Sequence, residues 1–293
     1  MKMHLNDMLT SKRKGRVALI RAEHEESLLT VKRGIEENLA DFILIGDGDI
    51  IREKAESLGI SLERCDIRPV QSDKDAADMG ARLAADKEID VLMKGMIQTS
   101  VFTKALLNRE WGLIPEGGLI SHMGLFELPG LDRPVGITDA ALNIQPDLSQ
   151  KIIILSNAIA VMHRLGVALV KAACIAPVEM ENPKIPSTID AAALSRMDWE
   201  GALVEGPLAL DAALSAKAAA VKGIESALAG EPDLLLFPDL NTANAVYKAF
   251  AFTPGSRNAG ILAGLSLPVI LTSRSDPEET RYLSLKLALG AME

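Results

Sequence analysis

Short apolar runs alternate with longer amphipathic stretches along most of the chain. The first apolar runs predict strands at 17–20, 42–45, 65–70 and 90–93. The stretches between them repeat apolar residues at helical spacing and predict helices at 23–40, 50–58 and 73–86. Strands that alternate with helices in this way are typical of parallel sheets with helices on both faces.

The same alternation continues through the rest of the chain. It predicts further strands at 119–126, 135–138, 168–175, 201–205, 234–236 and 268–272. It also predicts helices at 99–108, 146–163, 187–196, 242–250 and 277–289. Thr99 and Ser100 are expected to cap the first of these helices. Residues 1–16 are polar and basic, and we expect them to form a solvated lead-in.

Composition places the chain among globular proteins with a substantial core. Of its 293 residues, 48% are hydrophobic and 24% are charged, which suits one large or two ordinary domains. A formal net charge of −9 argues against non-specific nucleic-acid binding, because a basic face supplies most of that affinity. A local basic pocket for a small anion remains compatible with this charge. Aromatic residues are only 3%, so stacking platforms for bases are scarce.

Targeting and metal signals are missing from the sequence. The chain starts with polar residues and contains no apolar run of membrane-spanning length, so we expect a cytoplasmic protein without a membrane partner. Cys65 and Cys174 are far apart and form no zinc spacing, and we expect buried thiols. Gly46-x-Gly48 lacks a third glycine and follows the second strand, which argues against a nicotinamide site.

The stretch at 237–248, which reads FPDLNTANAVYK, predicts a turn and a helix directly after a short buried strand. Asp239 and Asn241 are good helix N-cap residues, because their oxygens accept otherwise unpaired N–H groups. A helix start offers free N–H groups and a positive dipole end to a phosphate. Asn244 and Lys248 would add a polar group and a cation. By itself, however, the pattern favours a plain structural cap.

A second candidate is the pair Lys94 and Gly95, directly after the strand expected at 90–93. The carboxyl end of a parallel strand is where α/β folds bind ligands. Lys104 lies on the next helix, and the two lysines are candidates to contact one anion. The structural alternative for Lys94 is a side chain that only extends its charge to solvent at a strand end.

Ser121 and His122 lie in the strand expected at 119–126. Histidine has a pKa suited to proton transfer near neutral pH. A half-buried strand histidine is more often a packing residue, so the pattern alone favours the structural interpretation.

Ser273 and Arg274 follow the last expected strand and precede the final helix. Arginine offers a planar fork of donors to a phosphate. The next acidic residues are Asp276, Glu278 and Glu279. As structural residues they would be an N-cap and a favourable first helical turn.

Taken in order, these stretches resemble motifs of the phosphate acetyl/butyryltransferase family. FPDLNTANAVYK is similar to the family signature FPDLNxxNxxYK, and residues 205–213 resemble DGPLxxDAA with Glu205 in place of aspartate. Residues 138–146 match a TDxxxNxxP run, and Ser273-Arg274 looks like the family's catalytic dipeptide. Lys104, where the acetyl branch has arginine, and the short Ser-Arg-Ser-Asp ending resemble the phosphate butyryltransferase (phosphotransbutyrylase) branch.

The resemblance implies two α/β domains with mainly parallel sheets around a cleft, an isocitrate/isopropylmalate dehydrogenase-like fold. We expect a discontinuous first domain at 1–141 plus 268–293 and a second domain at 142–267. The resemblance also implies a homodimer.

The implied activity is an acyltransferase reaction, acyl-CoA + phosphate ⇌ acyl phosphate + CoA, with a butyryl or acetyl group. One bound substrate would attack the other directly in a ternary complex. Acyl-CoA and inorganic phosphate are the implied partners. Coenzyme A is then a substrate, and no bound cofactor or metal is expected.

The resemblance also assigns residues. Arg274 would clamp phosphate, Ser273 would bond the thiol sulfur or the oxyanion, and a carboxylate would deprotonate the CoA thiol. We take Glu279 for that carboxylate, with Asp276 and Glu278 as alternatives. The expected phosphate- or acyl-binding residues are Lys94, Gly95, Lys104, Ser121 and His122. The expected CoA-binding residues are Asp239, Asn241, Asn244 and Lys248.

Two other functions compete with this one. An NAD- and metal-dependent dehydrogenase of the same fold would need a histidine–carboxylate metal set, which the sequence does not provide. A catalytically degenerate CoA-binding module is the other alternative, and the intact lysines and Ser-Arg pair argue against it.

Overall fold

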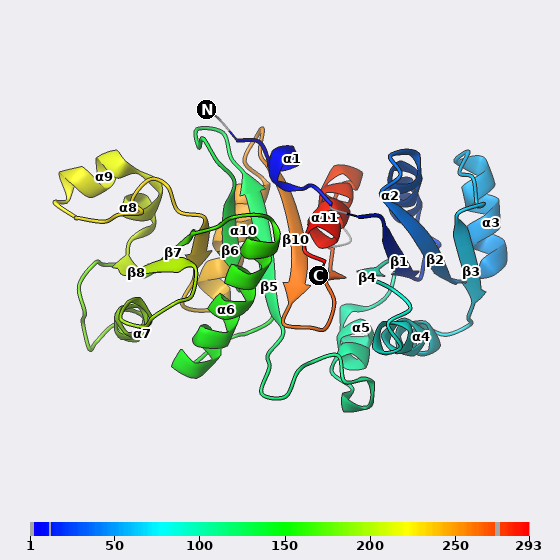
Figure 1. The fold of residues 1–293 in the computed structure, drawn as a ribbon, viewed down its shortest axis with the longest axis horizontal. Coiled ribbons are helices and arrows are strands. Elements are labelled where there is room, and N and C mark those ends of the chain that lie inside the picture. The colour runs from blue at the N-terminus through cyan, green and yellow to red at the C-terminus, as the bar shows by residue number, and fades with distance from the viewer. Residues whose placement is uncertain (1–2, 12, 273–275, 293) are drawn as a thin grey trace. The chain divides into compact units, whose positions relative to one another are not determined.

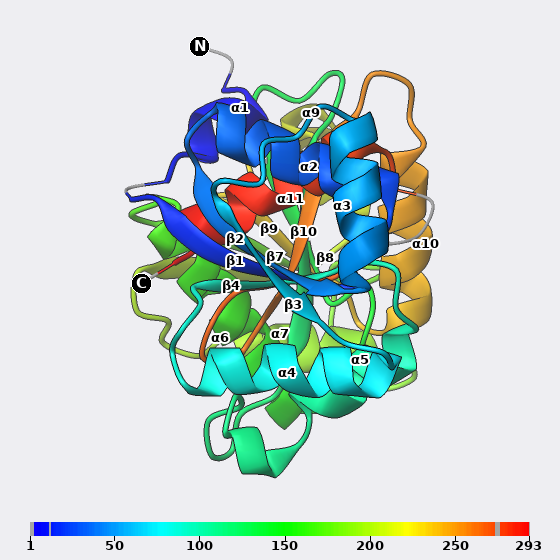
Figure 2. The ribbon, with the colours of Figure 1, turned by 90° about the vertical axis from the view of Figure 1, so that its right-hand side faces the viewer.

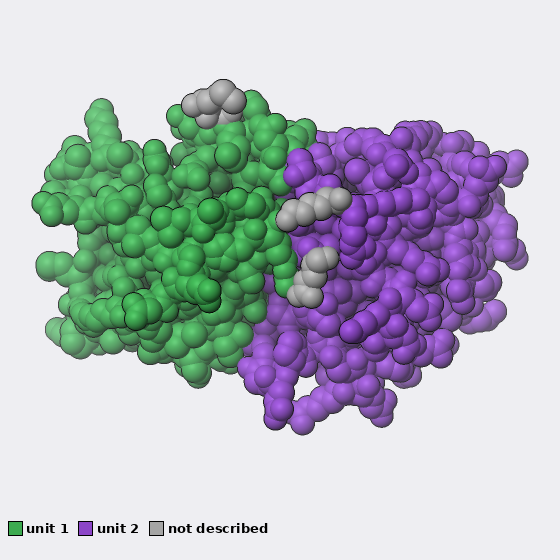
Figure 3. Space-filling model, viewed as in Figure 1, with its two compact units in different colours: residues 1–8, 121–258 green, residues 9–120, 259–293 purple. Residues whose placement is uncertain are grey.

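The computed structural model describes residues 3–11, 13–272 and 276–292. It divides into two compact units, coloured green and purple in Figure 3. Unit 1 comprises residues 1–8 and 121–258, and unit 2 comprises residues 9–120 and 259–293. The division differs from the predicted boundaries, which placed 121–141 with the first part of the chain. Residues 121–138 fall in unit 1 because their two strands hydrogen-bond into its sheet.

Unit 2 is built on a mainly parallel sheet with the strand order β3-β2-β1-β4-β11-β10. Its strands are β1 (Gly15–Ile20), β2 (Ala40–Gly46), β3 (Cys65–Pro69), β4 (Val91–Lys94), β10 (Arg257–Ala263) and β11 (Val269–Ile270). β10 runs antiparallel to β11. The chain returns to this sheet near its C-terminus, because β11 pairs with β4 in parallel.

Helices cover both faces of the unit 2 sheet. They are α2 (Glu25–Glu36), α3 (Gly48–Ser57), α4 (Asp73–Ala85), α5 (Thr99–Leu106) and α11 (Glu278–Gly290), with a short 3₁₀ helix at Arg109–Trp111. Figure 2 shows α2, α3 and α11 on one face and α4 and α5 on the other. Asp47 and Ser72 accept N–H groups at the starts of α3 and α4, so both helices begin at a capping side chain.

The strands of unit 1 follow the order β5-β6-β9-β7-β8. They are β5 (Ser121–Glu127), β6 (Val135–Thr138), β7 (Val170–Ile175), β8 (Ala202–Leu208) and β9 (Leu234–Leu236). The helices of unit 1 are α1 (Leu5–Met8), α6 (Leu148–Arg164), α7 (Pro186–Ser195), α8 (Leu210–Leu214), α9 (Ala216–Val221) and α10 (Leu240–Ala251). β5 is antiparallel to β6, whereas β6 pairs with β9, β9 with β7 and β7 with β8 in parallel.

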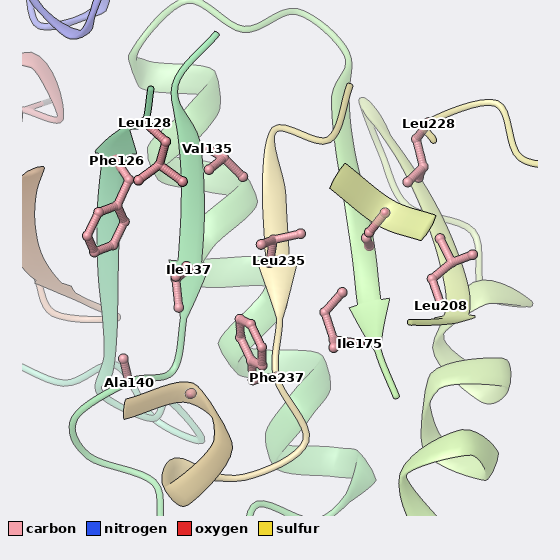
Figure 4. Close-up of a cluster of buried hydrophobic side chains, with 13 residues drawn as sticks. Phe126, Leu128, Val135, Ile137, Ala140, Ile175, Leu208, Leu228, Leu235 and Phe237 are labelled. Atoms are coloured by element: carbon pink, nitrogen blue, oxygen red, sulfur yellow. The ribbon is translucent and has the colours of Figure 1, made fainter. Parts of the chain in front are cut away.

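The core of unit 1 fills the space between its sheet and α10. Figure 1 shows α6 in front of the strands and α10 behind them. Phe126, Ile137, Leu235 and Phe237 point to one side of the sheet, as Figure 4 shows, and Phe250 packs against this cluster. Alternating strand residues supply this layer, because successive side chains of a strand point to opposite faces.

Three local predictions are wrong. Residues 1–16 contain α1, whose Leu5 and Met8 are buried, instead of a solvated lead-in, and Glu127 accepts the N–H of Leu5 at 2.8 Å. β10 lies where no element was predicted, because Gly260 weakens the alternating signal. α5 begins at Thr99, and its N-cap residue is Gln98, which makes no side-chain cap bond.

No helix in the described part of the chain combines the length and the apolar character needed to cross a membrane.

Candidate active site

The middle of the unit 2 sheet contains a topological switch point. β1 and β4 are neighbours, and Ile20 pairs with Lys94 at the carboxyl ends of both strands. From there the chain continues into α2 on one face and α5 on the other (Figure 2). Open parallel sheets bind ligands in the crevice at such a point. Lys94 therefore ends its strand where the sequence predicted.

A small pocket opens at this switch point. It is lined by His24, Ser27, Lys94, Gly95, Met96, Thr272 and Arg281. Lys94 and Arg281 are each only 3% exposed, so two cationic side chains are buried around one small space. Charges of the same sign that share a pocket favour binding of an anion between them.

Gly95 is required by the close packing of the chain at this pocket. A Cβ atom at Gly95 would lie 2.4 Å from the carbonyl oxygen of Arg21 and 2.5 Å from that of Ile20. The Gly95 N–H also donates to the Ile20 carbonyl at 2.8 Å. Any larger residue would push the turn after β4 away from β1 and displace Lys94.

Arg281 is held in place by α11 and by the end of the last strand. Its Nη1 donates to Thr272 Oγ1 at 2.8 Å, and its Nε donates to the Asp276 carbonyl at 3.3 Å. Burial lowers the pKa of Arg281, and the carboxylates of Asp276 and Glu26 oppose this effect. An arginine pKa lies so far above neutrality that the guanidinium stays charged.

Arg281 was not among the predicted site residues, although the sequence contains a signal for it. Arg281 lies in helical register with Leu285 and Ala288, and all three are buried. An arginine on the apolar stripe of a helix is unusual, because burying a charge is costly without partners.

His24 and Ser27 bring the start of α2 into the pocket. His24 is the N-cap residue of α2, and its side chain makes no cap hydrogen bond. Burial lowers the pKa of His24, and the charge of Arg281 acts in the same direction. The Ser27 side chain is fully buried, and its Oγ has no hydrogen-bond partner among the described residues.

Lys104 does not share this pocket. It is exposed in the last turn of α5 and is not among the described residues that line the space beside Lys94. The predicted contact of both lysines with one anion is therefore not seen in unit 2, where the second cation is Arg281.

The predicted Ser273 and Arg274 lie outside the described residues. Thr272, the residue directly before them, lines the pocket. Asp276, shortly after them, provides the carbonyl that accepts from Arg281.

Glu279 is paired with an arginine of α2. Arg33 Nη1 donates to Glu279 Oε2 at 2.8 Å and to Glu278 Oε1 at 3.1 Å. The Arg33 guanidinium also lies 3.4 Å from the centre of the Tyr282 ring. This pairing holds the Glu279 carboxylate in one orientation.

Ser121 and His122 lie at the carboxyl edge of the unit 1 sheet. They begin β5, which runs antiparallel to β6, and Met123 pairs with Thr138 at the end of β6. The Ser121 and His122 side chains are buried, and Ser121 Oγ accepts from Asn157 Nδ2 at 3.0 Å. The sequence did not indicate Asn157, which comes from α6.

His122 is buried beside the ring of Tyr247. Its Nδ1 has no hydrogen-bond partner among the described residues, and its ring meets Tyr247 edge-on with 5.4 Å between ring centroids. Burial lowers the pKa of His122, and the carboxylate of Asp139 opposes this effect. The neutral imidazole is therefore the favoured form.

The helix that follows β9 is capped at its N-terminus by a carboxylate of the chain itself. Asp239 accepts the backbone N–H and the hydroxyl of Thr242, at 2.9 and 3.0 Å, and so caps α10. A carboxylate there works against a bound phosphate at the same position. Asn244 Nδ2 donates to the Ala140 carbonyl at 3.0 Å, whereas Asn241 and Lys248 are exposed.

Within the described residues, no three histidine, cysteine, aspartate or glutamate side chains form a group that could hold a metal ion.

Comparison with known proteins identifies the family. The profile of the family described as phosphate acetyl/butaryl transferase matches residues 66–287. Phosphate butyryltransferase of Clostridium acetobutylicum is 41% identical over 282 residues, which cover 95% of this chain and 93% of that protein. Phosphate acetyltransferase of Rickettsia felis is 37% identical over 278 residues, which cover 93% of this chain and 79% of that protein.

Solved structures agree with this fold. A branched-chain phosphotransacylase from Enterococcus faecalis V583 superposes with a TM-score of 0.83 at 29% identity, over 94% of this chain and 98% of that one. A 4-hydroxythreonine-4-phosphate dehydrogenase from Burkholderia phymatum shares the fold alone, with a TM-score of 0.58 at 11% identity over 96% and 99% of the chains. The chain therefore has the predicted α/β fold and belongs to the phosphate acetyl/butyryl transferase family of phosphate acyltransferases.

Proposed function

We propose that this protein transfers a butyryl-sized acyl group reversibly between CoA and inorganic phosphate. The observation that carries the proposal is the position of Lys94. It is buried at the switch point of unit 2, in a pocket whose wall includes Thr272, the residue before Ser273 and Arg274. Membership of the phosphate acyltransferase family supports the same reaction and not the dehydrogenase alternative.

The proposed reaction is a direct displacement. A phosphate oxygen attacks the thioester carbonyl carbon, the new C–O bond forms, and the C–S bond breaks. The electron pair of the C–S bond leaves on sulfur, and the CoA thiolate then takes a proton. The products are acyl phosphate and CoA, and no covalent enzyme intermediate is needed.

The chain's own residues would stabilise charge in this reaction. Lys94 and Arg274 would bind the phosphate oxygens, since both are cationic and arginine binds phosphate with two parallel bonds. Ser273 would donate to the oxyanion or to sulfur. Glu279 would exchange the thiol proton, with Asp276 as the next carboxylate. Preorganised donors of this kind lower the barrier because they need no reorganisation during reaction.

The unit 1 residues are assigned by chemistry. Ser121 and a neutral His122 would contribute hydrogen bonds without charge, which suits a carbonyl or acyl group. Asn241 and Lys248 are exposed on α10, and we propose that they contact CoA. Asp239 and Asn244 would support CoA binding indirectly, because their hydrogen bonds to Thr242 and Ala140 fix the position of this helix start.

The acyl chain length and the assembly are also proposals. The chain is 41% identical to a phosphate butyryltransferase and 37% identical to a phosphate acetyltransferase, which supports a butyryl-sized substrate. We propose a cytoplasmic homodimer that needs no bound metal or cofactor.

The test is release of free thiol from acyl-CoA by the purified protein. We expect release that depends on added phosphate and is faster with butyryl-CoA or isobutyryl-CoA than with acetyl-CoA. Omitting phosphate is the control for thioester hydrolysis. A folded protein that binds CoA and releases no thiol from any of the three would instead be the degenerate CoA-binding module.

A further inference from the structure

Among the described residues, no group hydrogen-bonds to the Ser27 hydroxyl. Ser27 lies in the first turn of α2, it is fully buried, and it lines the small pocket beside Lys94 and Arg281. Burying a hydroxyl without a hydrogen bond costs free energy, which a bound ligand with acceptor oxygens would recover. A water would satisfy the hydroxyl but leave the two positive charges unbalanced, whereas an anion does both.

The start of α2 points to the same kind of ligand. α2 has twelve residues, and its N-cap residue, His24, does not use its side chain to cap it. The first N–H groups of a helix have no partner within the helix and lie at the positive end of its dipole. The Ser27 N–H already donates to the His24 carbonyl at 3.1 Å, so the helix start contributes the positive end of its dipole, and the Ser27 hydroxyl and the two cations supply the donors to the pocket.

The charge balance of the lining selects an anion. Lys94 and Arg281 supply positive charge, while Ser27, His24 and Thr272 supply neutral polar groups. The carboxylates of Glu26 and Asp276 act on Arg281, but among the described residues lining the pocket none carries a carboxylate. The described lining therefore carries net positive charge, which favours a negatively charged ligand.

The chemistry of the lining favours a phosphate group as that anion. The pocket is lined by an arginine, whose planar fork binds phosphate with two parallel hydrogen bonds. Lys94 Nζ donates to the Gly95 carbonyl at 3.3 Å, a long bond that it can exchange for a stronger bond to a phosphate oxygen.

We infer that Arg281, Ser27 and the N-terminus of α2, together with Lys94, form the subsite for inorganic phosphate and for the phosphoryl end of acyl phosphate. Arg281 holds two phosphate oxygens, and the Ser27 hydroxyl donates to a third. The catalytic meaning of this subsite rests on the proposed function, but phosphate binding is measured without any turnover.

Phosphate binding is tested first, by thermal unfolding in increasing inorganic phosphate at constant ionic strength, with and without CoA. Ser27→Ala removes an unpartnered hydroxyl, so without phosphate we expect it to melt no lower than wild type. We expect its apparent Kd for phosphate to rise several-fold, and that of Arg281→Lys to rise about tenfold or more.

Ser284→Ala is the matched control for Ser27→Ala. Ser284 is also fully buried, but its Oγ donates to the Thr280 carbonyl at 2.7 Å and accepts the Gly260 N–H at 3.0 Å. We expect this variant to melt lower than wild type and to keep the wild-type Kd for phosphate.

Steady-state kinetics separate the subsite from the rest of the active site. For Arg281→Lys we expect KM for phosphate to rise about tenfold or more and KM for butyryl-CoA to stay within about twofold. Arg64→Lys is the control, because Arg64 is tied to Asp41 at 2.8 Å and to two backbone carbonyls, away from the pocket.

The outcomes for the two proposals can be told apart. Phosphate binding that weakens in both Ser27→Ala and Arg281→Lys supports the subsite even if no acyl-CoA is turned over. Turnover with unchanged KM for phosphate in both variants overturns the subsite and leaves the proposed function standing. Wild-type protein that phosphate does not stabilise, either alone or with CoA, also overturns it.

Discussion

Arg33 binds two neighbouring carboxylates at once, and this decides what either of them can do. Its guanidinium contacts Glu278 and Glu279 and stacks on Tyr282, so α2 and α11 are joined at this point. The sequence showed both acids in a first helical turn but not the arginine between them, which is about 245 residues away. At the residue scale, the side chain that pairs with a carboxylate decides whether that carboxylate has a structural or a catalytic role.

Two glutamine substitutions test this assignment. If Glu279 exchanges the thiol proton, Glu279→Gln lowers kcat about a hundredfold, because a positioned general base contributes at least that much. Glu278→Gln loses a bond to the same arginine and should keep kcat within about threefold. Rates are measured at saturating butyryl-CoA and phosphate. Equal, small losses in both variants would make the Arg33 group structural and move the role to Asp276.

Arg281 shows what residue-level prediction lacked. Its position on the apolar stripe of the last helix is visible in the sequence, but its neighbours His24, Ser27 and Lys94 come from two other segments. Local periodicity reports which face of a helix is buried, not which distant side chains meet it there.

At the scale of elements, helix starts were predictable because capping is local. Asp239 caps α10, as its position in the sequence indicated, and Asp147 caps α6, which begins two residues after the predicted start at 146. Both side chains accept N–H groups from the first turn. The start of α10 also shows that the stretch at 237–248 does not by itself establish a phosphate site. A capping carboxylate and a bound phosphate compete for the same N–H groups.

The Asp239 cap gives a stability prediction. Asp239→Ala should lower the free energy of unfolding by about 1 kcal/mol, because the Thr242 N–H loses its acceptor. Asp239→Asn keeps a capping oxygen and should stay within about 0.5 kcal/mol of wild type. Both are measured by chemical denaturation. A loss in Asp239→Asn as large as in Asp239→Ala would mean that the negative charge, not the hydrogen bond, stabilises this end of the helix.

Strand order could not be predicted from the elements themselves. β9 spans Leu234–Leu236 as predicted, yet its neighbour β6 lies about 100 positions earlier in the chain and its neighbour β7 about 60 positions earlier. Pairing of β6 with β9 places the loop after β6, which starts at Asp139, at the carboxyl edge of the unit 1 sheet. The antiparallel β5 then brings Ser121 and His122 to the same edge.

At the scale of the whole molecule, stability is coupled to pH through two histidines, the half-buried His24 of unit 2 and the buried His122 of unit 1. The pKa values of His24 and His122 are lowered from the ordinary value of 6.5, in both cases mainly by burial. Arg281 adds to the effect at His24, while the nearby carboxylates of Glu25 and Glu26 oppose it. Both side chains therefore bind a proton less readily in the folded chain than in the unfolded chain.

The sign of the pH dependence follows from this difference. Above pH 6.5 the histidines are mostly neutral in both states, and their effect on stability is constant. Below it the unfolded chain takes up protons first, so the free energy of unfolding falls as pH decreases toward the folded-state pKa values.

Denaturation curves between pH 7.5 and 5.5 test the prediction. We expect wild-type stability to decrease over this range and the decrease to be smaller in His24→Asn and in His122→Asn. A free energy of unfolding that is flat in wild type, or that falls equally steeply in both variants, would contradict it.

The sequence by itself determined the order of most strands and helices, the Asp239 cap of α10, and the motifs that resemble the family. These features depend on residues a few positions apart, whose spacing is printed in the chain. The tertiary structure alone decided that β5 and β6 join β9, that α1 packs on the end of β5, and that Arg281 shares a pocket with Lys94 and Ser27. Each of these contacts joins segments far apart in sequence, and strand register and helix packing select them only when the chain is folded.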